Sequence, residues 1–379
     1  MALAPYAMRV EDSAGRDVPE PPHPYRNDYQ RDRDRITHSA AFRRLSHKTQ
    51  VFTGMLGDYH RNRLTHTLEV ASIARTVARA LGLNEDLTEA LALAHDIGHP
   101  PFGHAGEGML NERLKEQGGF NHNRQALRIV ELLEQRYADR PGLNLTAEVL
   151  DGQRARGDKP ARAAERLDPQ PHPDAQRLAP VLEAQVVDAA DRIAYDAHDA
   201  DDAIQIGLLE LDELTDSTLW ADSVGAVHKQ YCALTPAQLR RATVHGLIER
   251  LVSDLLETSS SALERGDYGS VEKARGAGLL IAPSTEIVEQ QRALERILFE
   301  RVYRHDTVLE QRRVSVGALE ELYQQKLADP SQLRGPYAAI IDQEGAPRAV
   351  ADYVSSLTDR AVLEATGHSV APVSAGGSG

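Results

Sequence analysis

The chain of 379 residues is poor in cysteine and lacks long hydrophobic runs. Its one cysteine, Cys232, cannot form an internal disulfide, and such scarcity suits a reducing compartment, so we expect a cytoplasmic protein. No run of about 18 uncharged apolar residues occurs, and the N-terminus carries no apolar leader segment. The sequence therefore predicts neither a membrane span nor a secretory signal.

Positive charge is also scarce, because 43 Lys and Arg residues face 57 Asp and Glu residues, giving a formal net charge of −14. This balance argues against broad, nonspecific coating of nucleic acid. It still allows a local basic pocket for an anionic small molecule. Hydrophobic residues make up 41% of the chain, enough for one large core or for a main domain with an appendage.

Period-two alternation is rare, and neither a convincing βαβ unit nor a glycine-rich phosphate loop is found. Apolar residues instead recur at helical spacing, which predicts an all-α fold. Asn84 is expected to cap one helix, with Glu85 and Asp86 in its first turn. The predicted helices cover residues 65–81, 84–96, 123–137 and 182–202, and others lie near 237–258, 285–304 and 315–327.

We expect four parts in the chain. These are a flexible N-terminus over residues 1–24, a core over 25–210, a helical C-terminal part over 211–366 that packs on the core, and a flexible tail over 367–379. Residues 153–178 are polar and predict a mobile loop or insertion within the core. Residues 237–327 offer amphipathic helices for oligomer contacts, although such helices usually pack on their own core.

Histidine is concentrated near the N-terminus, since nine of the fifteen histidines fall in residues 1–122. Residues 95–107 read HDIGHPPFGHAGE and thread three histidines and two carboxylates through glycines and prolines. Imidazole and carboxylate groups bind divalent cations. Glycine and proline hold a ligand-bearing loop in shape with little side-chain bulk. This segment is the first candidate for the chemistry of the protein.

Three predicted helices direct polar residues toward the core. His66 shares a helical face with Val70, Ile73 and Val77, His95 with Leu87 and Leu91, and Asp191 with Val187 and Ala194. Each residue alone could be a buried histidine bonded to a carbonyl or an aspartate paired with an arginine. Together with Asp96 they form a four-ligand set, because burying four such groups without a partner would be costly. Mn²⁺ and Mg²⁺ are expected first, and Fe²⁺, Co²⁺ and Zn²⁺ are the other candidates.

The order His66, His95-Asp96, Asp191 resembles the H…HD…D signature of the HD-domain metal-dependent phosphohydrolases, and residues 95–107 resemble the bacterial dGTP triphosphohydrolase branch of that family. The stretches 32–36, 42–45, 48–52, 61–66 and 185–196 also fit. Residues 352–360 resemble the family's closing motif, except that Ser355-Ser356-Leu357 replaces the usual Ala-Gly-Met. The resemblance implies that residues 25–210 form an HD-domain helical bundle with a helical C-terminal extension.

The implied reaction converts a deoxynucleoside triphosphate and water into the deoxynucleoside and tripolyphosphate. It assigns the metal to His66, His95, Asp96 and Asp191, and makes His104 and Glu107 a catalytic pair beside Asp96. His104 would protonate the departing 5′-oxygen while Glu107 orients its ring, which requires a helix to begin before His104. A loop histidine bonded to backbone is the other interpretation of His104.

The resemblance also implies a substrate pocket. Arg63 lies one turn from His66 and could reach a phosphate, and Arg44 and Arg192 are further candidates. His99 and His122 match positions along the phosphate path. Asp191, Tyr195 and Asp199 form one stripe on a helix, so that Tyr195 would pack on the sugar while Asp199 and Gln50 bond its 3′-hydroxyl. Core packing is the alternative for Tyr195, and solvated surface is the alternative for many of the arginines.

Two other function classes stay open. Another HD enzyme, such as a nucleotidase or guanosine-tetraphosphate hydrolase, would share the metal ligands but is not expected to carry His104, Glu107 and the Tyr195–Asp199 stripe. A dNTP-sensing or single-stranded-DNA-binding regulator would need degraded catalytic residues, and these are intact. Relatives are often tetramers or hexamers, so we expect a homo-oligomer, with a dNTP or single-stranded DNA as candidate effectors.

Overall fold

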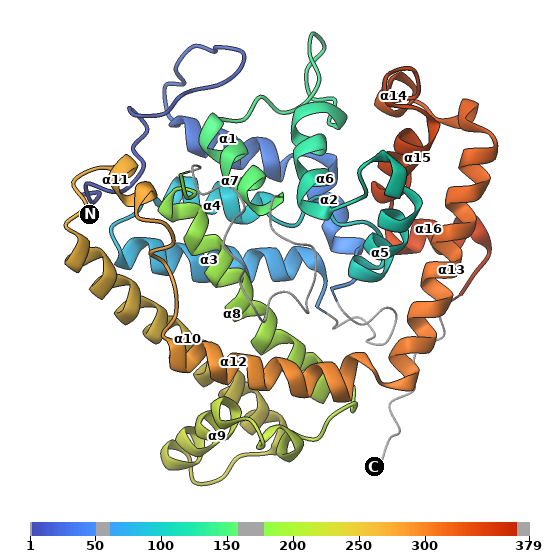
Figure 1. Ribbon diagram of the computed structural model, residues 1–379. Coiled ribbons are helices and arrows are strands. Elements are labelled where there is room, and N and C mark those ends of the chain that lie inside the picture. Colours follow the sequence, from blue (N-terminus) through green and yellow to red (C-terminus); the bar gives the residue numbers. More distant parts are fainter. Residues whose placement is uncertain (1, 51–60, 158–177, 370–379) are drawn as a thin grey trace.

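The computed structural model describes residues 2–50, 61–157 and 178–369, and in these ranges the chain is built from α-helices (Figure 1). The helices are α1 (Asp28–Thr37), α2 (Ala40–Arg44), α3 (Arg63–Ala80), α4 (Glu85–Ala94), α5 (Gly103–Arg113), α6 (His122–Arg128), α7 (Ala147–Gly157), α8 (Leu182–Gln205), α9 (Thr218–Gln230), α10 (Pro236–Gly266), α11 (Val271–Gly276), α12 (Thr285–Leu298), α13 (Asp306–Ala328), α14 (Pro336–Glu344), α15 (Ala346–Ser355) and α16 (Asp359–Thr366). Within the described ranges the only β pairing is three isolated bridges, so the all-α prediction is confirmed.

The centre of the molecule is the packing of α3 against α4 and α8. Local sequence sets the starts of the first two helices. The Asn62 side chain accepts a hydrogen bond from Thr65 N in a capping box, and Asn84 accepts from the backbone of residues 86 and 87, as the sequence predicted. Because α8 crosses α3 and also touches α4, one point in the core is shared by all three helices (Figure 1).

The helix predicted over 123–137 is shorter than expected. α6 ends at Arg128, a π-helical turn covers Ile129–Leu133, and Glu134 is extended. The chain then folds back, and Leu143 N donates to the Val130 carbonyl at 2.7 Å. Gly142 makes this return feasible, because a Cβ atom there would lie 2.5 Å from the Glu131 carbonyl oxygen. Tertiary pairing of the returning loop therefore ends the helix before its apolar pattern ends.

The prediction of a loop from residue 153 is wrong at its beginning. Residues 153–157 belong to α7, and Gln153 is buried. Arg156 of α7 forms ion pairs with two carboxylates of α8. These tertiary contacts stabilise α7, and the composition of the segment alone does not reveal them. Residues 158–177, the rest of the predicted loop, lie outside the described residues.

Residues 2–24 pack on the helices, whereas the sequence predicted a flexible N-terminus. Ala7 is fully buried, and Met8 N donates to a carboxylate oxygen of Glu183 on α8 at 3.0 Å. Arg16 forms an ion pair with the buried Asp32 of α1. These long-range contacts replace the local structure that the segment lacks. The predicted tail at 367–379 lies mostly outside the described residues.

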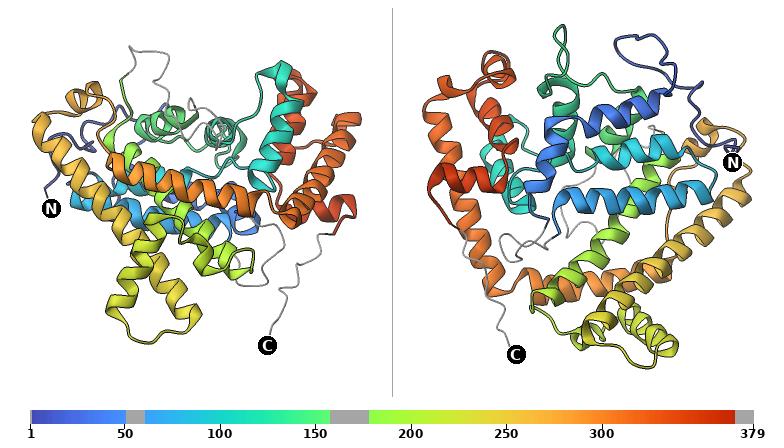
Figure 2. Two further views of the ribbon diagram at one scale, coloured as in Figure 1. Left: turned by 60° about the horizontal axis from the view of Figure 1, so that its bottom comes forward. Right: turned by 180° about the vertical axis from the view of Figure 1, so that it is seen from behind.

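The C-terminal helices surround the centre on two sides. α13 packs beside α5, and α14 to α16 gather at that end of the molecule (Figure 1). At the other end, α9 and the start of α10 form a projecting lobe, which Figure 2 shows from two further sides. None of the helices in the described ranges combines the length and apolarity that a membrane crossing requires.

Candidate metal centre and active site

The shared point of α3, α4 and α8 holds His66, His95, Asp96 and Asp191, hereafter the His–Asp cluster. His66 Nε2 lies 3.2 Å from Asp191 Oδ1, and His95 Nε2 lies 3.7 Å from the same oxygen and 3.5 Å from Asp96 Oδ1. His66, His95 and Asp96 are almost fully buried. The three helices thus direct two imidazoles and two carboxylates at one small volume, as the sequence predicted.

The donor atoms of this cluster fit a divalent cation. His95 Nδ1 donates to the Ala92 carbonyl at 2.6 Å, which leaves the lone pair of Nε2 facing the cluster. That Nε2 is buried and has no hydrogen-bond partner in the described ranges. Burial lowers the pKa of His95 and so favours the neutral form that binds metals. A mixed nitrogen and oxygen set suits several divalent ions and selects no single one.

Each carboxylate of the His–Asp cluster is also paired with an arginine. Arg63 Nη1 lies 2.7 Å from Asp96 Oδ2, and Arg156 Nη2 lies 2.8 Å from Asp191 Oδ2. Burial alone would raise the pKa values of both aspartates, but the neighbouring histidines and arginines outweigh it and hold them well below the usual range. Both carboxylates are therefore ionised and have their second oxygen fixed in place.

Sequence reasoning missed Arg156 and expected Arg63 to bind phosphate. The Arg63 guanidinium is instead occupied by Asp96 and by a long 3.5 Å contact to the Gln50 carbonyl. Arg156 sits where the composition predicted a loop, and only the helical spacing of residues 147–157 could have indicated that it points inward.

A second group, hereafter the histidine cluster, adjoins the first. It contains His99, His104, Glu107 and His122. His99 Nδ1 lies 2.9 Å from Asp96 Oδ1, so the two clusters meet there. The rings of His99 and His122 stack at 3.8 Å between centroids, and the His104 ring lies 5.4 Å from that of His99.

Glu107 links two histidines of this cluster. Its Oε2 lies 2.9 Å from His104 Nδ1, and its Oε1 lies 2.8 Å from His122 Nδ1. Burial opposes ionisation of Glu107, but the two imidazoles hold its pKa far below the ordinary value. The side chain of His104 is 47% exposed, while Glu107 and His122 are buried. Glu107 thus orients the His104 ring from the buried side of the cluster, and the His104 side chain is partly exposed.

The backbone before His104 is constrained. Phe102 and Gly103 both have positive φ, and α5 begins at Gly103, so His104 and Glu107 lie on its first turn. Glycine suits position 103, because it adopts the positive φ without cost and because a Cβ atom there would lie 2.6 Å from Arg63 Nη2 and displace that guanidinium. The turn that pairs His104 with Glu107 is therefore eased by glycine at this position.

Residues close to the C-terminus anchor this loop. Asp359 accepts hydrogen bonds from Phe102 N and Thr49 N, each at 2.9 Å. The buried Lys48 amino group donates to the carbonyls of His99 at 2.6 Å and Ser355 at 2.8 Å. Burial lowers the pKa of Lys48 to about 7. The stretch that contains the unusual Ser355-Ser356-Leu357 is thus linked through Lys48 to the loop before His104.

The predicted stripe on α8 is extended by a tyrosine from another segment. The Tyr195 hydroxyl lies 2.9 Å from the Tyr303 hydroxyl, which in turn donates to Asp199. Burial raises the pKa of Asp199 to about 6. Sequence reasoning missed Tyr303, which follows α12 and was seen only as part of a helix.

The other predicted substrate residues lie around these groups. Gln50 Oε1 is buried without a hydrogen-bond partner in the described ranges. Arg192 is bonded to Glu295 of α12 at 3.1 Å. Arg44 is half-buried near Lys48, and among the described residues it forms no hydrogen bond or ion pair with either cluster. The structure thus gathers the predicted residues around one site, with Arg44 and Arg192 at its margin.

Comparison with known proteins agrees with this geometry. Residues 63–196 match the HD domain, and residues 281–367 match a phosphohydrolase-associated domain. The deoxyguanosinetriphosphate triphosphohydrolase-like protein of Brucella anthropi is 43% identical over 94% of this chain and 92% of its own length. That of Thiobacillus denitrificans is 43% identical over 95% of both chains, and that of Geobacter metallireducens is 40% identical over 96% and 93%. The chain therefore belongs to the deoxyguanosinetriphosphate triphosphohydrolase-like family of HD-domain phosphohydrolases.

Proposed function

We propose that the protein hydrolyses deoxynucleoside triphosphates, dGTP among them, to the deoxynucleoside and tripolyphosphate in a metal-dependent reaction. The observation that carries the proposal is the junction of the two clusters at Asp96 and His99. This junction supports the proposal because four residues that could hold a metal lie beside a histidine that could exchange a proton with a substrate. The names of the relatives, deoxyguanosinetriphosphate triphosphohydrolase-like proteins, are consistent with the same substrate.

The residues would divide the work as follows. A divalent cation held by His66, His95, Asp96 and Asp191 would polarise a phosphate oxygen and favour attack by water at the α-phosphorus. His104 would give a proton to the departing 5′-oxygen, since Glu107 lies against its Nδ1 and orients a side chain that is partly exposed. His99 and His122 would contact the phosphates.

The sugar would lie against the stripe of α8. We propose that the Tyr195 ring packs on the C2′ side, where a ribose 2′-hydroxyl would clash and find no partner. Asp199, with Gln50, would bond the 3′-hydroxyl. Tyr303 would hold Asp199 and Tyr195 in place, because its hydroxyl touches both.

The product of the reaction tests the proposal. Purified protein is incubated with dGTP, Mn²⁺ and ¹⁸O-labelled water, and the products are identified by ion chromatography and mass spectrometry. We expect unlabelled deoxyguanosine and tripolyphosphate carrying one ¹⁸O atom, because water attacks phosphorus and the 5′-oxygen leaves. Release of monophosphate would indicate a different HD phosphohydrolase, and no release at all would favour the regulator. A His95→Ala variant controls for contaminating phosphatases.

Assembly and regulation stay predictions. We propose a homo-oligomer, a tetramer or hexamer, because relatives are expected to assemble and α10, α12 and α13 offer extended surfaces. A dNTP or single-stranded DNA is the proposed effector. Sedimentation with and without dGTP measures both, and a monomer in each condition would contradict the proposal.

A further inference from the structure

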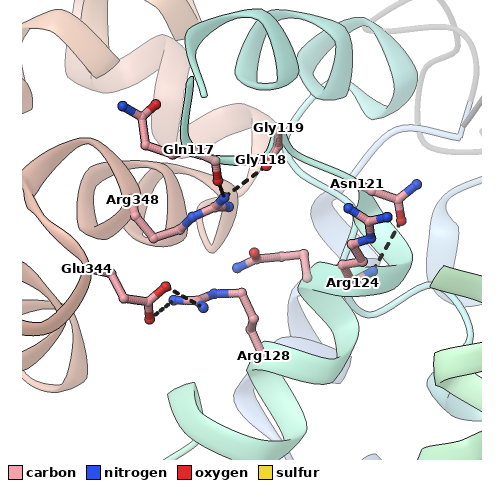
Figure 3. A pocket seen from close by; sticks show the side chains of 9 residues that line it. Gln117, Gly118, Gly119, Asn121, Arg124, Arg128, Glu344 and Arg348 are labelled. Atoms are coloured by element: carbon pink, nitrogen blue, oxygen red, sulfur yellow. Dashed lines mark hydrogen bonds and ion pairs between the residues drawn. The ribbon is translucent and has the colours of Figure 1, made fainter. Parts of the chain in front are cut away.

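A basic cavity of about 370 Å³ lies between α6, the loop at residues 117–119 and the α14–α15 region (Figure 3). Arg124 and Arg128 of α6 and Arg348 of α15 line it, together with Gln125 and a single carboxylate, Glu344. None of these residues belongs to the His–Asp cluster or to the histidine cluster. The cavity is therefore a separate feature of the molecule.

The positive charge in this cavity is only partly neutralised. Arg128 is paired with Glu344 at 2.8 Å and with the buried Asp352 behind it. Arg348 donates through Nη2 to the uncharged carbonyls of Gln117 and Gly119, each at 2.9 Å (Figure 3). Within the described ranges neither Arg348 nor Arg124 has an ion pair. Arg128 and Arg348 thus share the carboxylates of Glu344 and Asp352, which leaves the exposed Arg124 as the excess positive charge among the described residues, and burial beside Arg128 lowers the pKa of Arg348.

Gln125 supplies an independent observation. Its side chain lines the cavity and is only 2% exposed. Its NH2 group faces the buried Asp352 carboxylate, whereas its Oε1 has no hydrogen-bond partner in the described part of the chain. Buried amide oxygens are normally satisfied, so this Oε1 at the wall of a cavity indicates that a donor from a ligand or from ordered solvent completes it.

The cavity and the histidine cluster share one short helix. His122 is the first residue of α6, and Arg124, Gln125 and Arg128 follow on the same helix. α6 is packed tightly on the segment after Asp96, since a Cβ atom at Gly98 would lie 2.0 Å from the His122 carbonyl oxygen and 2.3 Å from Ala126 N. A ligand bound in the cavity would therefore contact α6, the helix that places His122 against Glu107.

We propose that this cavity binds a phosphate-bearing anion at a site distinct from the catalytic centre. Guanidinium groups bind phosphate oxygens through paired, charge-assisted hydrogen bonds. The volume lies near the lower end of the range of about 300–1,000 Å³ found for small-molecule pockets, which suits a short phosphate chain. Inorganic polyphosphate and the phosphates of a nucleotide share this chemistry.

Calorimetric titration in the presence of a chelator tests the proposal without turnover. The probes are inorganic phosphate, inorganic tripolyphosphate and dGTP. Arg348→Gln should weaken tripolyphosphate binding at this site by about tenfold or more, the scale expected for losing a charge-assisted contact. Arg334→Gln is the matched control, because Arg334 is exposed and bonds only to nearby backbone carbonyls.

Arg124→Glu is a second variant in case Arg348→Gln does not fold. Arg124 is exposed, so its replacement should be tolerated, and it reverses one positive charge at the cavity. We expect it to weaken binding at least as much as Arg348→Gln, with unchanged circular dichroism. Equal affinity and stoichiometry in the parent protein and in both variants would overturn the proposal. If the affinity for dGTP is no higher than the affinity for tripolyphosphate, the site recognises only the phosphate groups of its ligand. Because the titration measures binding without turnover, its outcome does not depend on whether the parent protein hydrolyses dGTP.

Discussion

The two clusters of the site share an edge but differ in how they are built. The His–Asp cluster draws its members from helices α3 and α8 and the end of α4, and its two histidines are at most 1% exposed. The histidine cluster depends on a loop with two positive φ angles, and its His104 is half open to solvent. The contrast shows a division of labour. Helices fix the members of the buried cluster that we propose to hold an ion, and a loop with positive φ angles presents the partly exposed His104.

Removing a ligand of the His–Asp cluster should have the largest effect. We expect His95→Ala to abolish metal uptake and turnover, because His95 Nε2 has no other role in the described structure. Metal content is measured by elemental analysis after dialysis, alongside activity. Circular dichroism should stay close to that of the parent, and full occupancy at an unchanged rate would refute this ligand assignment.

The matching change in the histidine cluster should separate catalysis from metal binding. His104→Ala is expected to lower kcat by about 10²-fold or more, the usual scale for general acid catalysis, with metal content unchanged. A decrease in kcat of less than threefold would instead support the alternative interpretation, in which His104 is a structural loop histidine bonded to backbone. Loss of a bound ion would show that the histidine cluster itself holds metal.

Sugar discrimination should change at the stripe beside both clusters. The parent protein is expected to prefer dGTP over GTP by roughly 10² in kcat/KM, since an excluded, unpaired hydroxyl costs a few kcal/mol. Tyr195→Ala should narrow this gap and slow turnover. Asp199→Ala should instead raise KM for deoxynucleotides. Equal kcat/KM for dGTP and GTP in the parent would contradict the deoxyribose pocket.

Replacing Arg156 tests whether a residue that bonds one of the proposed metal ligands, without being a ligand itself, affects metal affinity. Arg156 bonds the Asp191 oxygen that faces away from His66. Arg156→Met is expected to weaken metal affinity by about tenfold or more, the range seen when an outer partner of a ligand is lost. Competition with a chelating dye measures this. Arg154→Met is the control, because Arg154 lies on the same helix but bonds only Asp151 and Glu131. An equal effect of the two variants would mean that Arg156 acts only on α7.

The smallest effect concerns a buried carboxylate without an arginine, in contrast to those of the His–Asp cluster. Burial raises the pKa of Glu183 to about 7, although backbone N–H groups of Met8 and Asn84 bond its Oε1. Because the folded-state pKa is above the unfolded value, the stability from this group is present at low pH and is lost as pH rises through about 7. The loss amounts to roughly 3 kcal/mol at most.

Glu183→Gln should remove this pH dependence. Urea unfolding at pH 5 and pH 8 with chelator present compares the variant with the parent, and the variant should gain relative stability at pH 8. Identical differences at the two pH values would show that Glu183 is ionised in the folded protein throughout.

Much of this architecture is local and could be predicted. Helical spacing identified the inward faces of His66, His95 and Asp191, and Asn84 announced the start of α4. The end of α6 and the packing of residues 2–24 could not be predicted, because partners far along the chain decide them. The site followed the same rule. The four members of the His–Asp cluster could be identified in the sequence, while Arg156 and Tyr303 reach the site through tertiary packing.

The anchoring of the loop before His104 by Asp359 has a consequence for synthesis. Phe102 and Asp359 are separated by 257 positions, whereas every member of the His–Asp cluster has been made by residue 191. A chain emerging from the ribosome therefore contains the whole His–Asp cluster long before the carboxylate that holds the loop before His104. The four residues of the cluster can meet in an unfinished chain, but the loop gains its anchor only after residue 359 has been made.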